Sequence, residues 1–287
     1  MGSDFFNDLF DNLSKTLSDF DLAKFDFTRF SNFSEVRSKL GSKGAEKFKN
    51  QVESQRKKLF HPQGLMICIA ADDTKWIYEK QSDIFNSQEA DLKAAFGVVC
   101  AYDKKLDLAS KAFDAIPGKA NQIVESRGLI AYERDKFHLA VDYLKDNKSS
   151  KYGAIAHSLS LLEMGDTDLT THIRILNHVK SDLAERIAGI LAFNEGDYDL
   201  AQIQFEMAWE KNKSEKNLLN LLAAKRHLEE NYAAAEFTRV VSSYLIQSGL
   251  TPSQNVIDNY IFQSTIPIPS MKLGNKLYKA LKIVNHL

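Results

Sequence analysis

Apolar residues recur at helical spacing on both sides of a Gly-Asp dipeptide within residues 184–209. Ala188, Leu191 and Phe193 precede the dipeptide, and the apolar stripe resumes after it from Leu200 to Trp209. Stripes with a period of about 3.6 residues predict amphipathic helices. The Gly-Asp pair predicts a tight turn, because Gly adopts positive φ and Asp accepts hydrogen bonds from nearby amides. The stretch therefore predicts a helical hairpin, which needs neighbours to bury its apolar faces.

Weaker copies of this hairpin precede and follow it. Anchored on Ala201, equivalent positions are separated by 31, 30, 31 and 34 residues, and they are Ala109, Ala140, Thr170, Ala201 and Ala235. A small residue stands twelve positions before each anchor: Gly97, Gly128, Ser158, Gly189 and Ala223. Small residues in paired helices allow the two axes to approach to about 8 Å. The regularity predicts a series of similar hairpins.

These units resemble tetratricopeptide repeats (TPR). Four residues of the central unit occupy the family's small, Ala, aromatic and Ala positions: Gly189, Ala201, Phe205 and Ala208. The unit around Ala109 matches three of those positions, the other units match fewer, and the resemblance covers residues 88–244. It implies an all-α fold, a right-handed α-solenoid of about five to six TPR-like helical hairpins with extra N- and C-terminal helices. We assign the solenoid to residues 61–247, and expect residues 65–87 to be helical.

The N-terminal extension, residues 1–60, is rich in Phe and then basic. Residues 4–33 place phenylalanines on a helical face and carry a net charge of −3. Residues 34–60 carry +5 and predict one or two helices that are interrupted near Gly41-Gly44. The Phe-rich face fits packing against the solenoid, docking to another protein, or contact with a membrane surface. Its acidic character disfavours the membrane, since interfacial helices usually carry Lys and Arg.

The C-terminal region, residues 248–287, predicts capping helices. Thr251-Pro252 is a helix-start signal, and Pro267 with Pro269 excludes helix over the following stretch. We expect Ser270 to cap a last helix that places apolar residues on one face and lysines on the other. That helix either covers the last exposed core face or contacts acidic protein, lipid headgroups or RNA. It lacks the aromatic-plus-Arg platform of single-strand binders, which argues against nucleic acid.

Composition narrows the class of protein. Forty-four per cent hydrophobic and 26 per cent charged residues are ordinary for a globular protein, and a net charge of −1 gives no general attraction to nucleic acid or anionic lipid. Cys68 and Cys100 lie among apolar neighbours and read as buried free thiols of a reducing compartment. The N-terminus does not resemble a secretory signal, and no apolar run is long enough to span a bilayer. These features predict a cytoplasmic protein.

No motif indicates catalysis. The chain lacks a Gly-rich phosphate loop and the HExxH and GxSxG patterns, and His172 and His178 have no partner at metal-ligand spacing. We therefore predict that the protein is not an enzyme, with no cofactor and no metal.

The resemblance to TPR proteins implies a binding groove lined by the first helix of each hairpin. Carried over by repeat position, the partner-binding residues are Tyr102, Glu125, Tyr132, Glu133, Glu163, Arg186, Asn194, Asn220 and His227. Ala94 and Val98 stand where family members that clamp a C-terminal carboxylate have Lys and Asn, so we expect no such clamp. The acidic and aromatic character of the groove suits a basic or amphipathic helix or peptide of another protein.

Two functional hypotheses follow. The first is a protein-protein interaction scaffold or adaptor that binds a peptide or helix in the concave solenoid groove. The alternative is a structural subunit of a larger assembly, with or without membrane association, which uses the Phe-rich N-terminus and the Lys-rich C-terminal helix as contacts.

Overall fold

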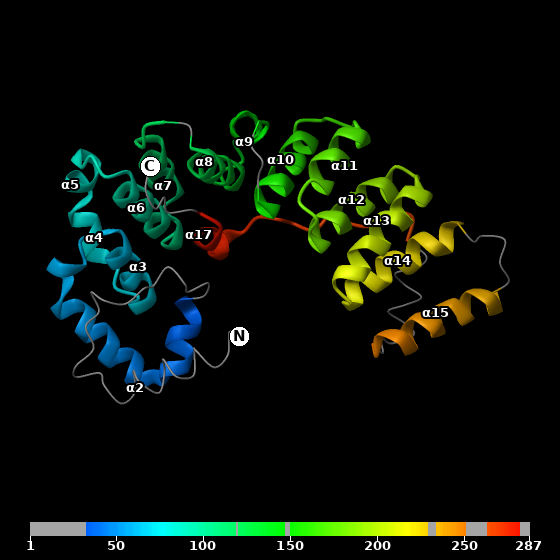
Figure 1. Ribbon diagram of the computed structural model, residues 1–287, viewed down its shortest axis with the longest axis horizontal. Helices are drawn as coiled ribbons and strands as arrows, with labels where there is room; N and C mark the ends of the chain where they lie inside the picture. Colours follow the sequence, from blue (N-terminus) through cyan, green and yellow to red (C-terminus); the bar gives the residue numbers. More distant parts are fainter. Residues whose placement is uncertain (1–32, 119, 147–149, 229–233, 251–262, 282–287) are drawn as a thin grey trace. The chain divides into compact units, whose positions relative to one another are not determined.

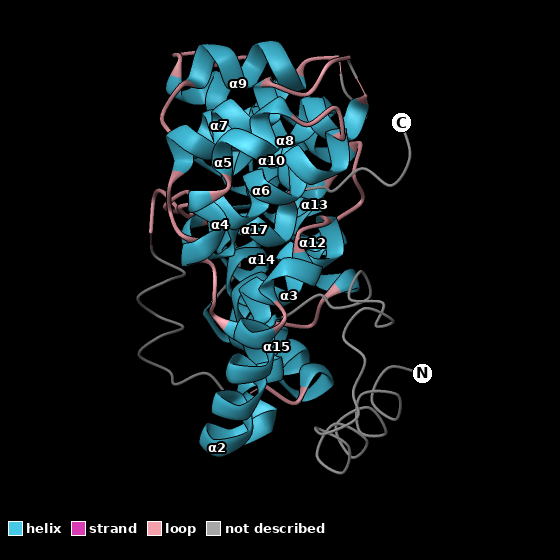
Figure 2. Cartoon of the chain, turned by 90° about the vertical axis from the view of Figure 1, so that its left-hand side faces the viewer, coloured by secondary structure: helices cyan, strands magenta, loops and turns pink. Residues whose placement is uncertain are grey.

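The computed structural model describes residues 33–118, 120–146, 150–228, 234–250 and 263–281 (Figure 1). These residues form helices joined by loops, with no strand among them (Figure 2), so the prediction of an all-α fold is confirmed. The chain divides into two compact units. Unit 1 comprises Met1–Lys136 and Lys272–Leu287, and unit 2 comprises Phe137–Met271.

Unit 1 contains a series of helices in which neighbours along the chain pack together. They are α2 (Phe33–Ser54), α3 (Pro62–Ala71), α4 (Lys75–Glu79), α5 (Gln81–Asn86), α6 (Ala90–Tyr102), α7 (Leu106–Asp114), α8 (Asn121–Glu133) and α17 (Leu277–Ala280), with 3-10 turns η3 (Arg56–Leu59) and η4 (Gly274–Lys276). Helix α2 packs on α3, α3 on α6, α6 on α7 and α7 on α8. The helical prediction for residues 65–87 is confirmed, apart from short connecting turns.

The interruption predicted near Gly41-Gly44 is present in α2, at Gly41. Gly41 has φ 65° and ψ 174°, a backbone conformation that glycine adopts readily and that kinks the helix. The Phe-rich face predicted within residues 4–33 and the helix start at Thr251-Pro252 both lie outside the described residues, except for Phe33 at the start of α2.

Unit 2 continues the same arrangement. Its helices are α9 (Phe137–Leu144), α10 (Lys151–Glu163), α11 (Leu169–Asn177), α12 (Asp182–Asn194), α13 (Tyr198–Lys211), α14 (Glu215–Leu228) and α15 (Ala234–Ser248). Each helix packs on the next, and α12 also contacts both α10 and α14, its equivalents in the flanking hairpins. The turn at Gly196-Asp197 is as predicted, with φ 82° at Gly196 and the Asp197 carboxylate accepting from the Leu200 amide.

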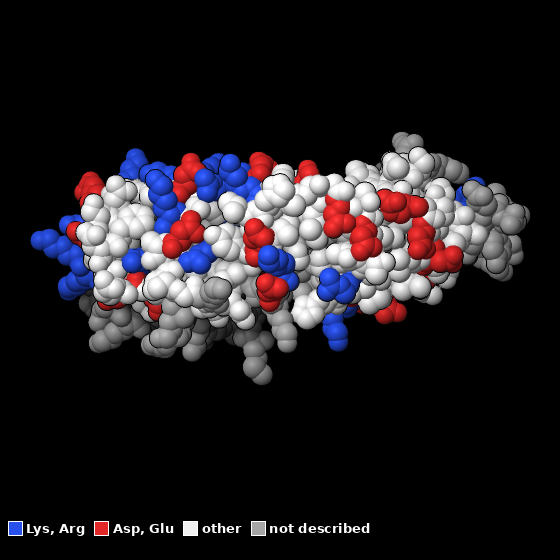
Figure 3. Space-filling model, turned by 90° about the horizontal axis from the view of Figure 1, so that it is seen from above, with Lys and Arg blue, Asp and Glu red and all other residues white. Residues whose placement is uncertain are grey.

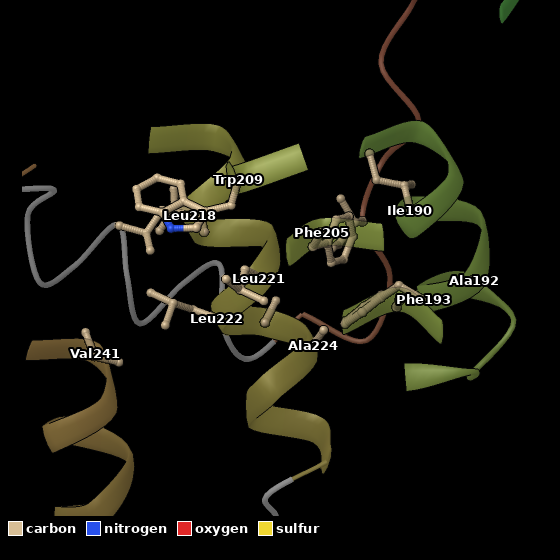
Figure 4. Close-up of a cluster of buried hydrophobic side chains, with 14 residues drawn as sticks. Ile190, Ala192, Phe193, Phe205, Trp209, Leu218, Leu221, Leu222, Ala224 and Val241 are labelled. Carbon is tan, nitrogen blue, oxygen red and sulfur yellow. The ribbon is translucent and has the colours of Figure 1, made fainter. Parts of the chain in front are cut away.

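The core of unit 2 joins α12, α13, α14 and α15. Phe193, Phe205 and Leu221 are completely buried there, and Trp209 and Val241 extend the same cluster (Figure 4). Burying a side chain of this size contributes about 1.5–3 kcal/mol relative to leaving it in water. The amphipathic stripes in the sequence therefore correspond to the faces that pack between neighbouring helices.

Two of the predicted small positions are required by an aromatic ring in the paired helix. A Cβ added to Gly189 would lie 2.5 Å from the ring of Phe205, and one added to Gly97 would lie 2.5 Å from the ring of Phe113. Both rings are fully buried, so neither can move aside into solvent. The glycine thus provides the space that the aromatic side chain of the following helix fills.

The predicted helix from Ser270 to the C-terminus is wrong over its first residues. Residues 266–273 are not helical, and only the 3-10 turn η4 and the four residues of α17 follow within the described part. Pro267 and Pro269 lack amide donors, and Gly274 has φ 49°. The amides of Leu273 and Gly274 donate to Glu133, whereas in the predicted helix the Gly274 amide would donate to the Ser270 carbonyl.

Gly189→Ala should lower the free energy of unfolding by about 1–3 kcal/mol, because overpacking beside a buried ring outweighs the better helix propensity of Ala. Urea unfolding followed by circular dichroism measures this loss. In a Phe205→Leu background the same substitution should cost much less, since the two sites are in contact. Equal losses in both backgrounds would show that the ring does not set the requirement for glycine.

Candidate functional site

The end of α12 in unit 2 holds the main chain of Ile266. The Asn194 side chain donates from Nδ2 to the Ile266 carbonyl at 2.9 Å, and its Oδ1 accepts from the Ile266 amide at 2.8 Å. A main-chain carbonyl can only accept and an amide N–H can only donate, so this pairing fixes the orientation of the Asn194 amide. One side chain therefore satisfies both polar groups of a residue in an extended segment.

The end of α14 provides a second main-chain contact in unit 2. Nε2 of His227 lies 3.1 Å from the carbonyl of Gln263, so this nitrogen carries the proton and donates. The imidazole stacks on Tyr198 with ring centroids 4.4 Å apart and meets the edge of Phe193 at 5.1 Å. These aromatic contacts orient the ring toward the segment.

The Ile266 side chain adds an apolar contact to these hydrogen bonds. It is 1 per cent exposed and belongs to the same buried cluster as Phe193 and Leu221, and Ile268 packs against that cluster. The helix ends of unit 2 thus bind an extended segment through its main chain and through one buried aliphatic side chain.

In unit 1, the end of α8 binds a later part of the same C-terminal region. The carboxylate of Glu133 accepts from the amides of Leu273 and Gly274, the latter at 3.1 Å. Amides bonded to a carboxylate form charge-assisted hydrogen bonds, which are stronger than neutral ones. Glu133 therefore holds two consecutive main-chain donors.

Lys272 lies over the carboxyl end of α8. Its ammonium donates to the carbonyl of Tyr132 and to the Asp135 carboxylate, which is 2.7 Å away, and lies 4.7 Å from the centroid of the Tyr132 ring. A cation is favoured at a helix C-terminus and over an aromatic face. Because Asp135 is 70 per cent exposed, water screens the ion pair, and the carbonyl and ring contacts define the position.

The residues that follow Lys272 cover α6 and α8 (Figure 1). Leu277, Tyr278 and Ala280 are buried, and α17 contacts both helices. The Tyr278 ring meets the ring of Tyr102 edge to face at 5.2 Å, and the Tyr102 hydroxyl donates to Asp72 at 2.9 Å. We call residues 263–281 the C-terminal segment.

Five of the predicted partner-binding residues contact the C-terminal segment: Tyr102, Tyr132, Glu133, Asn194 and His227. The other four are placed differently. Glu125 and Asn220 are 7 and 1 per cent exposed, which leaves little of either side chain accessible, Arg186 is half-buried and Glu163 is exposed.

Sequence reasoning missed Ile266, Lys272 and Leu273 as the residues held at these helix ends. The stretch Ile-Pro-Ile-Pro carried a signal, because prolines two apart with apolar residues between them favour an extended, pre-ordered chain. Such a chain exposes apolar side chains unless another surface receives them.

The buried Ser158–His172 pair has the hydrogen bond of a nucleophile and a base. Ser158 Oγ lies 3.0 Å from Nδ1 of His172, whose Nε2 donates to the Asp166 carbonyl at 3.1 Å. Ser158 is completely buried and His172 is 2 per cent exposed, so a substrate has no access to the hydroxyl. The pair connects α10 to α11 and serves packing.

Other reactive groups are equally enclosed. Burial raises the pKa of both the Cys68 and the Cys100 thiols to about 12, so both thiols stay protonated near neutral pH. Among the described residues, no group of three His, Cys, Asp or Glu side chains is arranged to hold a metal ion.

On the face shown in Figure 3, Lys and Arg side chains lie mainly in the left half of the view, together with some Asp and Glu, whereas Asp and Glu side chains predominate on the right. No helix in the described ranges combines the length and apolarity needed to cross a bilayer. No family model, curated protein or solved structure matches the chain.

Asn194→Ala should weaken the docking of the C-terminal segment in unit 2. Two hydrogen bonds of about 0.5–1.5 kcal/mol each are lost, so the Ile266 amide should exchange about 10-fold faster. Hydrogen–deuterium exchange of the intact protein measures this, with Glu195→Ala at the exposed neighbouring position as the matched control. Equal exchange of this amide in the two variants would contradict the assignment.

His157 in α10 should make unit 2 less stable in acid. Its pKa is lowered from 6.5 by burial and by the charges of Arg174 and His172. The unfolded chain therefore takes up a proton first as the pH falls, and stability present above about pH 6.5 is lost below it. Urea unfolding at pH 7.5 and 5.5 should show a larger loss for wild type than for His157→Gln. An identical pH dependence would refute the assignment.

Proposed function

We propose that the protein is a TPR-like α-solenoid that serves as an interaction scaffold and binds an extended segment of another protein at the ends of its first helices. The term first helix denotes the earlier member of each hairpin, such as α12 and α14. Repeat proteins present such equivalent helices side by side, and the exposed ends and faces of these helices form a binding surface.

The packing of the helices supports the solenoid part of this proposal. Helix α12 pairs with α13, and it also contacts α10 and α14, which stand at the equivalent place in the flanking hairpins. The same glycine–ring contact occurs in two hairpins of different units: a Cβ added to Gly97 would lie 2.5 Å from the Phe113 ring, and one added to Gly189 would lie 2.5 Å from the Phe205 ring. A repeated helix–helix contact of this kind is what a stack of similar hairpins requires.

The single observation that carries the binding part is the pair of hydrogen bonds from Asn194 to the Ile266 main chain. Main-chain recognition does not depend on the side chains of the bound segment, so the same amide can hold a segment of different sequence. Specificity then comes from side-chain contacts such as the buried site that Ile266 occupies.

The proposal is tested by affinity purification from the native source. The bait is the full chain, either wild type or with Asn194→Ala and His227→Ala together. We expect the double variant to recover about 10-fold less of the partner than wild type does, because the side chains that make three hydrogen bonds to the bound segment are removed. Label-free mass spectrometry quantifies the recovery.

Glu195→Ala with Thr167→Ala provides the matched control, since both are exposed residues in the turns that follow the first helices α12 and α10. Circular dichroism must show equal helicity for all baits. Recovery of the same proteins in equal amounts by wild type and by the Asn194/His227 variant would show that these helix ends are not the binding surface.

A further inference from the structure

The helix ends proposed to bind a partner are occupied by the protein's own C-terminal segment. In unit 2 the occupying residues run from Gln263 to Ile268, and in unit 1 they begin at Lys272. Tyr132 and Glu133, at the end of α8 in unit 1, contact the part of this segment that begins at Lys272. Asn194 and His227, at the ends of α12 and α14 in unit 2, contact its earlier part, at Ile266 and Gln263. A partner segment needs these same hydrogen-bonding groups, so the two compete.

We propose that the C-terminal segment is a built-in ligand, and that the partner is an extended, proline-containing segment of similar chemistry that binds by displacing it. This inference rests on the proposed function, since it names the partner chemistry for the same surface. The displaced segment and the incoming one exchange equivalent hydrogen bonds, so no new binding surface has to form.

The contacts define what the partner segment carries. It has a β-branched aliphatic residue for the site of Ile266, which is enclosed by the cluster that contains Phe193 and Leu221. A proline directly after that residue and a second one two residues further on keep the chain extended before it binds, which lowers the entropy lost on docking. They need no hydrogen bond, because Asn194 holds only the main chain of Ile266.

At the end of α8 in unit 1, the contacts favour a basic residue in the partner segment. Lys272 is received by the Tyr132 carbonyl and ring together with the Asp135 carboxylate, and Glu133 accepts the two amides that follow it. An acidic residue in place of Lys272 would face Asp135, Glu133 and the negative end of α8. The partner therefore presents Lys or Arg, followed by two free amides, and an acidic partner segment is disfavoured.

Because the built-in ligand belongs to the same chain, its effective concentration is high. Tethered segments commonly reach effective concentrations of about 1 mM, so a separate segment with equal intrinsic affinity competes poorly. Its apparent affinity is reduced by the fraction of molecules in which the site is free. The partner binds more readily if its segment has a higher intrinsic affinity than the C-terminal segment, or if a change weakens the docking of the C-terminal segment.

The test uses a fluorescent synthetic peptide with the sequence of residues 263–281 and the full-length protein. In the release variant, Ile266→Asp and Lys272→Ala weaken the built-in segment but leave every residue of α6, α8, α12 and α14 unchanged. In the matched control, Thr265→Asp and Lys276→Ala make the same changes at exposed positions. Fluorescence anisotropy measures peptide binding, and hydrogen exchange at Ala280 and Leu281 reports release of the segment.

We expect the release variant to bind the peptide at least 10-fold more tightly than wild type and the control do. A peptide that carries Glu at the position of Lys272 should bind at least 10-fold more weakly than the parent peptide. Equal peptide affinity in all three proteins, or no binding to the release variant, would overturn the inference. So would a wild-type dimer that dissociates in the release variant, since it would assign the segment to a second copy.

Partner recovery separates this inference from the proposed function. If displacement is correct, the release variant recovers more of the native partner than wild type does. If recovery is equal while the Asn194/His227 variant still loses the partner, displacement is wrong and the proposed function stands. If the Asn194/His227 variant also keeps the partner, the proposed function itself fails.

Discussion

The close approach of paired helices at a glycine is the constraint on which the helical packing depends. Phe205 fills the space beside Gly189, and Phe113 does so beside Gly97, so a single methyl group at either glycine would separate the helices. The hairpin that contains Ser158 connects its two helices by a different contact. Its small residue forms a buried hydrogen bond with His172 in the next helix. In each of these hairpins a small residue of the first helix faces the paired helix, where it meets either a phenylalanine ring or a histidine.

Local sequence patterns predicted the helices because each amphipathic stripe records the face that one helix buries. The kink at Gly41 and the turn at Gly196 were predictable for a similar reason, since glycine at each point adopts a backbone conformation that other residues avoid. The C-terminal segment was mispredicted because its structure depends on distant residues. The Leu273 amide bonds to Glu133, 140 positions earlier in the chain. A helical spacing of Leu and Lys contains no information about such a contact.

Repeat position predicted helix-end residues that contact the C-terminal segment, but it did not predict the segment itself, and the role of these residues in partner binding stays a prediction. Repeat positions identified Asn194, His227 and Glu133 because equivalent helices expose equivalent residues. Their hydrogen bonds go to main-chain groups, and these are present in every residue, so no sequence signal reveals which segment they bind. The expected preference for a basic or amphipathic partner stays a prediction. The chain's own Lys272 and the buried face of α17 nevertheless have that chemistry, which links the proposed partner to the built-in one.

The central claim is that the C-terminal segment lies on these helix ends in the intact protein. Hydrogen–deuterium exchange of the full-length wild-type chain at neutral pH tests it most directly, read at the amides of Ile266, Leu273 and Gly274. Hydrogen bonding to Asn194 and Glu133 predicts exchange at least about 100-fold slower than for the same residues in a free peptide. Exchange at the free-peptide rate at all three amides would contradict the account.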